Sequence, residues 1–189
     1  MTSNHLAQIS QRMATATLAL IISMLLLNTA VWLYPNLGTT YGLGFGLTER
    51  LLVDRLLAAT GEQTVSLPWW QTLGGILLSS VPLLALACGL NHLRRLFQSY
   101  ARGEYFSSDA ASRLGKVGWA VAIWVVLDFL CEPMLSAWVT MNAPVGERLI
   151  TLSVTAPSFV ALFLAACISV IARILHEASD LDSESRSFV

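Results

Sequence analysis

Four long apolar runs constrain this chain more than any other feature. They cover about residues 13–34, 70–90, 117–139 and 149–175. A helix needs about 20 apolar residues to cross a bilayer, since each residue adds about 1.5 Å. Each run is long enough, so the sequence predicts four transmembrane helices. Only 12% of the residues are charged, about half of the share usual in soluble domains, and we therefore expect much of the surface to face lipid.

The predicted fold is all-α: a four-helix transmembrane bundle in a single domain of residues 1–175. Pro82, Pro133 and Pro157 fall inside the runs, where membrane helices tolerate proline, and we expect a mild kink at each. Residues 176–189 are acidic and rich in serine, which predicts a flexible tail. Between the first two runs, residues 48–59 have an apolar face, which predicts a short helix on the membrane surface in the first outer loop.

The distribution of Lys and Arg predicts that both termini are cytoplasmic. Cytoplasmic segments carry an excess of these residues, and with this topology eight of the eleven lie on that side. The eight are Arg12, Arg94, Arg95, Arg102, Arg113, Lys116, Arg173 and Arg186. The tryptophans at 32, 69, 70 and 138 then fall near the outer boundary, where aromatic belts lie.

The polar stretch 91–116 separates the second and third runs and holds five of the eleven Lys and Arg residues. Leu93, Leu96 and Phe97 continue the second helix, Gly103 can end it, and Ser107 or Ser108 can begin the next. Positive side chains at this position favour contact with lipid headgroups, and the turn at 103–107 is the best site for a protein partner. The candidate contact residues are Arg94, Arg95, Arg102, Gly103, Glu104, Phe106, Arg113 and Lys116.

The same stretch carries a family resemblance. Leu93, Leu96, Phe97, Tyr100, Gly103-Glu104, Phe106-Ser107, Arg113-Leu114 and Val117-Gly118-Trp119 form a pattern similar to the central signature of a bacterial family of four-span membrane proteins. That family is known only as a domain of unknown function, and its members are often encoded beside a small helix-turn-helix regulator. The resemblance implies a multi-pass protein of the bacterial cytoplasmic (inner) membrane. It supplies no catalytic residues.

Asp128 and Glu132 are the candidate intramembrane site, together with Asn28 in the first run. The two acids are four residues apart and share a helix face. Asp128 lies about 18 Å along the helix from Lys116, near the middle of the membrane. Acids at this depth are costly unless they are paired, protonated or in a wet cavity, and they often mark ion or proton pathways. Two interpretations stay open: a proton or cation site, and a buried polar knot. In the knot, Glu132 reaches Arg148 or Arg50, and Asp128 is hydrogen-bonded to one of Asn28, Ser79, Ser80, Ser153 and Thr155.

The remaining sequence argues against other functions. The cysteines at 88, 131 and 167 lie singly in apolar runs and lack zinc spacing, so we expect no metal and no cofactor. A net charge of −1 gives no case for nucleic acid, and no common catalytic motif is present. A membrane enzyme that acts on lipid or quinone would rest on the acid pair alone.

These observations predict a non-enzymatic integral membrane protein with a regulatory or sensing role, whose partners are the bilayer, a protein bound at residues 91–116 and further copies of the chain. The alternative is a subunit of a small oligomeric transporter or channel that uses Asp128 and Glu132.

Overall fold

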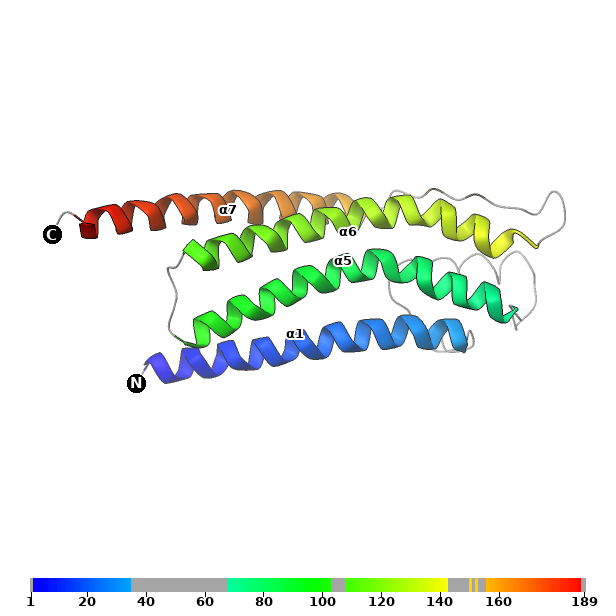
Figure 1. Ribbon diagram of the computed structural model, residues 1–189, viewed down its shortest axis with the longest axis horizontal. Coiled ribbons are helices and arrows are strands. Elements are labelled where there is room, and N and C mark those ends of the chain that lie inside the picture. Colours follow the sequence, from blue (N-terminus) through cyan, green and yellow to red (C-terminus); the bar gives the residue numbers. More distant parts are fainter. Residues whose placement is uncertain are drawn as a thin grey trace. The chain divides into compact units, whose positions relative to one another are not determined.

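All regular structure in the described part of the chain is helical. The computed structural model describes residues 2–34, 68–102, 108–142, 150, 152 and 156–187, and Figure 1 shows its four helices. They are α1 (Thr2–Leu33), α5 (Trp69–Ala101), α6 (Ser108–Thr140) and α7 (Ala156–Ser187). Each contains a segment long and apolar enough to cross a membrane, which confirms the four predicted spans. The predicted surface helix at 48–59 and the turn at 103–107 lie outside the described residues.

The helices are longer than the apolar runs. The second helix continues through Ala101 and the third begins at Ser108, as the pattern in the polar stretch predicts. α7 continues to Ser187, so helix also covers most of the segment 176–189. Propagation adds one backbone hydrogen bond for each residue fixed, and it extends an existing helix readily into residues such as Glu, Leu and Ala. The flexibility of this segment stays a prediction.

The fourth helix starts later than the apolar run does. α7 begins at Ala156, so Pro157 stands in its first turn. The first amides of a helix have no intrahelical partner, and a proline there removes no hydrogen bond. The kink expected at Pro157 was therefore a wrong prediction, whereas Pro82 and Pro133 do lie inside α5 and α6.

The contacts within the chain group into two compact units. Unit 1 comprises Met1–Ile21, Ala85–Ile123 and Ala156–Val189, and it draws on all four helices. Unit 2 comprises Ile22–Leu84 and Trp124–Thr155, and its helical parts come from α1, α5 and α6. The core of unit 2 is a cluster in which α1 and α6 meet, with Ile76 and Leu78 of α5 packed against it. Its members are Val31, Trp32, Cys131, Leu135 and Val139.

Glycines allow close helix contacts in both units. In unit 2, a Cβ on Gly75 would collide with the indole ring of Trp32. In unit 1, a Cβ on Gly118 of α6 would lie 2.6 Å from the Ser169 Oγ and 2.9 Å from the Ala165 carbonyl oxygen of α7. Since lipid tails are as apolar as leucine, membrane helices associate largely through such close packing.

Replacing Gly118 by alanine should destabilise the protein. The new Cβ would meet a backbone oxygen, which cannot rotate away, so α6 and α7 have to separate locally; overpacking of this kind costs about 1–3 kcal/mol. Gly115→Ala is the matched control, because its Cβ would meet only the Ala172 Cβ, at an ordinary 3.6 Å. The free energy of unfolding in a detergent titration measures the difference, and equal stability of the two variants would contradict the packing described.

Candidate functional site

Both intramembrane acids lie on the buried face of α6. The exposed fraction is 9% for Asp128 and 2% for Glu132. Buried residues of this helix recur at spacings of three and four: Val125, Asp128, Cys131, Glu132, Leu135, Ser136 and Val139. The acids thus share a face with the core of unit 2, and they point into protein while Phe129, Leu130 and Met134 are exposed. Neither acid lacks an interaction partner.

The third candidate, Asn28, belongs to a hydrogen-bonded cluster between α1 and α5. Its Nδ2 donates to the Ser79 Oγ at 3.1 Å and to the Ser80 Oγ at 3.3 Å. The Trp32 Nε1, one turn along α1, donates to the same Ser79 Oγ at 3.0 Å. Asn28, Trp32 and Ser79 are each 1% exposed, so a group of polar atoms deep in unit 2 is satisfied inside the protein.

The Ser79 hydroxyl is fully used in this cluster. It accepts hydrogen bonds from Asn28 and Trp32 and donates one to the Ile76 carbonyl oxygen at 3.2 Å. A hydroxyl has one donor and two acceptor sites. Ser79 was among the partners that the polar-knot interpretation offers to Asp128, and these three bonds occupy it instead. Two other offered partners, residues 153 and 155, lie outside the described residues.

Gln71 is a buried polar residue that sequence reasoning missed. Its Nε2 donates to the carbonyl oxygens of Trp138 and Val139 at 2.8 and 2.7 Å. Those carbonyls belong to the last turn of α6, where no later helical amide can reach them. In return, the Trp138 Nε1 donates to the Gln71 carbonyl at 3.0 Å, and Asn142 donates to the Gln71 Oε1 at 3.1 Å. The one available signal was a glutamine at the start of a span, opposite the end of the next.

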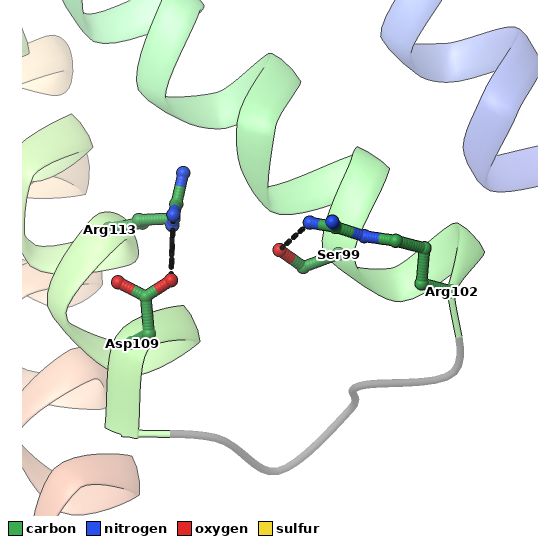
Figure 2. A network of polar contacts seen from close by, with 4 residues as sticks. All are labelled: Ser99, Arg102, Asp109 and Arg113. Atoms are coloured by element: carbon green, nitrogen blue, oxygen red, sulfur yellow. Dashed lines mark hydrogen bonds and ion pairs between the residues drawn. The ribbon is translucent and has the colours of Figure 1, made fainter.

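Arg113 and Arg102 differ in the side chain that each contacts, as Figure 2 shows. On α6, the Arg113 guanidinium binds the Asp109 Oδ2, with Nη2 at 2.7 Å and Nε at 2.8 Å. Asp109 lies in the first turn of α6, where a carboxylate is also favoured by the helix dipole. Directly after α5, the Arg102 Nη2 reaches the Ser99 Oγ of that helix at 3.5 Å. Arg113 is thus held within its own helix, which leaves less of its charge for headgroups.

The other candidate residues of the polar stretch are distributed as follows. Arg95 and Lys116 are exposed on α5 and α6, whereas Arg94 is half-buried. Gly103, Glu104 and Phe106 lie outside the described residues. No group of three metal-binding side chains occurs among the residues that the structure describes.

Four helices that are each long and apolar enough to cross a membrane define the class of the protein, an integral membrane protein. The chain belongs to the family described as "Protein of unknown function (DUF2975)", whose model matches residues 51–187. The resemblance found in the polar stretch is thereby confirmed, while the neighbouring regulator gene stays a prediction. No curated protein and no solved structure matches the chain significantly.

Replacing Ser79 by alanine should destabilise unit 2 more than replacing Ser80. The first change leaves the Trp32 indole without its acceptor and removes the shorter of the two contacts between Asn28 and the α5 serines, whereas the second removes only the longer of these contacts. A buried donor left unsatisfied costs about 1–3 kcal/mol, although bonds between membrane helices often contribute less. Unfolding by detergent titration, followed through tryptophan fluorescence, compares the variants. An equal effect of the two substitutions would show that the shared hydroxyl is unimportant.

Proposed function

We propose that the protein is a non-enzymatic component of the bacterial inner membrane that acts through a protein partner in a regulatory or sensing role. The observation that carries this proposal is that α5, α6 and α7 continue as helices beyond their apolar spans and expose polar side chains in unit 1. We call these side chains the polar end. Its exposed members are Arg95, Arg102, Ser108, Asp109, Ser112, Lys116, Arg173, His176 and Glu177.

The composition of the polar end supports a protein partner. Contact with anionic headgroups alone would favour positive charge only, yet Asp109 and Glu177 are exposed beside the cations. The helical backbone already fixes the positions of these residues before binding. Association therefore costs little free energy for ordering this surface. These features suit a surface with complementary charges of both signs.

The placement of positive charge supports a cytoplasmic polar end. All eight Lys and Arg residues that the predicted topology puts in the cytoplasm fall within the segments of unit 1. The other three, Arg50, Arg55 and Arg148, lie outside the described residues. An excess of Lys and Arg marks the cytoplasmic side, which is where soluble regulators would reach the protein.

Site-specific photo-crosslinking in native membranes tests the partner. A crosslinker placed at Lys116 or Arg95 should yield a protein adduct of discrete mass, because both side chains are exposed at the polar end. The control is Leu164, an exposed residue in the apolar part of α7, which should label lipid only. Charge reversal by Arg102→Glu should weaken the Lys116 adduct several-fold. Absence of a protein adduct at both positions would remove the basis of the proposal.

The buried acids favour a second candidate function, a subunit of an oligomeric transporter or channel. Asp128 and Glu132 lie one turn apart on the protein-facing side of α6, where a proton or cation could move between carboxylates. Four helices seldom enclose a pathway, so this function requires several copies of the chain. A protein that stays monomeric in lipid would count against it.

Asp128→Asn tests this second function. We expect the substitution to lower the proton or cation flux of reconstituted liposomes by about tenfold, because an amide cannot carry the exchangeable proton or the charge. Asp109→Asn makes the same chemical change on an exposed residue and should leave the flux unaltered. Equal flux and equal protein level in the Asp128 variant and the unmodified protein would exclude a proton role.

A further inference from the structure

A groove of about 510 Å³ runs between α6 and α7 within unit 1. Its lining includes Ser112 and Trp119 from α6 and Ser169, Arg173, His176 and Glu177 from α7. The groove shares Ser112, Arg173, His176 and Glu177 with the polar end, but neither proposed function gives it an occupant. Its composition changes along its length, and that change identifies the kind of molecule it fits.

The two helices run in opposite directions along the groove, so the last polar residues of α7 lie beside the start of α6. At one end, the Ser108 Oγ lies 3.5 Å from the His176 Nε2. Further along, Gly118 of α6 meets Ala165 and Ser169 of α7. Arg173, His176 and Glu177 therefore lie toward the first end and Trp119 toward the second, about 17 Å from Ser108 along α6.

Arg173 offers a cation at the boundary of the apolar part of the helix. Among the residues that the structure describes, none forms a hydrogen bond or ion pair with its guanidinium, in contrast to Arg113, which Asp109 holds. Its neighbours Ile171 and Ile174 are exposed apolar residues. A guanidinium binds a phosphate through two parallel hydrogen bonds, and lipid phosphates lie at this boundary between the hydrocarbon and the headgroups.

Glu177 restricts which phosphate fits. It lies one turn after Arg173 on α7, about 6 Å along the axis. A purely anionic headgroup would meet its carboxylate unfavourably. An ethanolamine headgroup carries a phosphate and a primary ammonium joined by a short two-carbon bridge, so one molecule can satisfy both side chains. A choline headgroup has the positive charge but no N–H with which to donate to the carboxylate.

Trp119 suits the remainder of such a lipid. Its side chain is exposed over 70% of its surface, although the residue belongs to a membrane-spanning helix. Tryptophan prefers the interface, where its ring can lie against the glycerol and the first carbons of the acyl chains. The floor of the groove beside it is made of small residues, among them Gly115 and Ala172, which leave room for a chain.

We propose that this groove binds one ethanolamine phospholipid. The phosphate contacts Arg173 and the Ser112 hydroxyl, the ammonium contacts Glu177, and an acyl chain follows Trp119 into the bilayer. This binding does not rest on the partner or transport functions above, since the crosslinking positions Lys116 and Arg95 do not line the groove and the acid pair belongs to unit 2.

Native mass spectrometry of the full chain in detergent tests the proposal. The probes are dioleoyl lipids with ethanolamine, choline or glycerol headgroups, each titrated separately. The unmodified protein should bind the ethanolamine lipid about tenfold more tightly than the other two, which corresponds to about one charge-assisted contact. Arg173→Gln should weaken ethanolamine-lipid binding by about tenfold. Arg95→Gln removes the same charge from an exposed residue of α5 outside the groove and should have no effect.

Glu177→Gln separates headgroup selection from general attraction to phosphate. This variant should still bind all three lipids through their phosphates, but it should no longer prefer the ethanolamine lipid over the choline lipid. It should also bind the glycerol lipid more tightly than the unmodified protein does. Circular dichroism of each variant controls for folding. Equal binding of the three lipids by the unmodified protein, stronger binding of the glycerol lipid, or equal losses in the Arg173 and Arg95 variants would each overturn the proposal. So would a dimer that Arg173→Gln dissociates and that retains no lipid, because a second copy would then occupy the groove.

Discussion

The structure depends on one constraint: a polar group buried among membrane-spanning helices has to find its hydrogen-bond partner inside the protein. The Trp124 Nε1 of unit 2 is buried without such a partner among the described residues, whereas the clusters at Ser79 and Gln71 meet the constraint with few atoms. The single Ser79 hydroxyl accepts hydrogen bonds from the Asn28 amide and the Trp32 indole of α1. It donates one to the Ile76 carbonyl oxygen of α5. The Gln71 side-chain amide donates hydrogen bonds to two carbonyl oxygens at the end of α6, which no later amide of that helix can reach. Asp128 and Glu132 are buried under the same constraint, and their burial against the core of unit 2 separates them from lipid.

The spans could be predicted from sequence because they depend on length and apolarity, both of which are local properties. The shared face of Asp128 and Glu132 on α6 could also be predicted, since a spacing of four residues alone puts the two side chains together. The pairing of Trp32 with Ser79 was not, because these residues are 47 positions apart and nothing local to either one distinguishes its partner from the other serines. The start of α7 was predicted too early. The residues before Pro157 are as apolar as those after it, so hydropathy does not indicate where the helix begins. The restriction that a proline places on the backbone of the preceding residue does indicate it.

The four helices are not packed to the same extent. The buried share of the apolar span is 11% in α7, against 28%, 28% and 33% in α1, α5 and α6. Where α7 does contact α6, the approach is made by small residues, as at Gly118, and its bulky residues, such as Phe159 and Phe163, are exposed. This distribution is the one expected of a helix that contacts mainly the surrounding bilayer. Its contacts with the rest of the protein, including the groove beside Arg173, are confined to one narrow side.

The bonds around Gln71 have a mechanical consequence. Four hydrogen bonds join the first turn of α5 to the last turn of α6 and its following residues. If either helix slid by one turn, about 5.4 Å, all four would break together and leave buried polar atoms exposed to hydrocarbon. The hydrogen bonds between α1 and α5 are made differently, by the Asn28 amide and the Trp32 indole to the hydroxyls of two adjacent serines, Ser79 and Ser80. Within unit 2, the four hydrogen bonds around Gln71 therefore fix the register of α5 against α6.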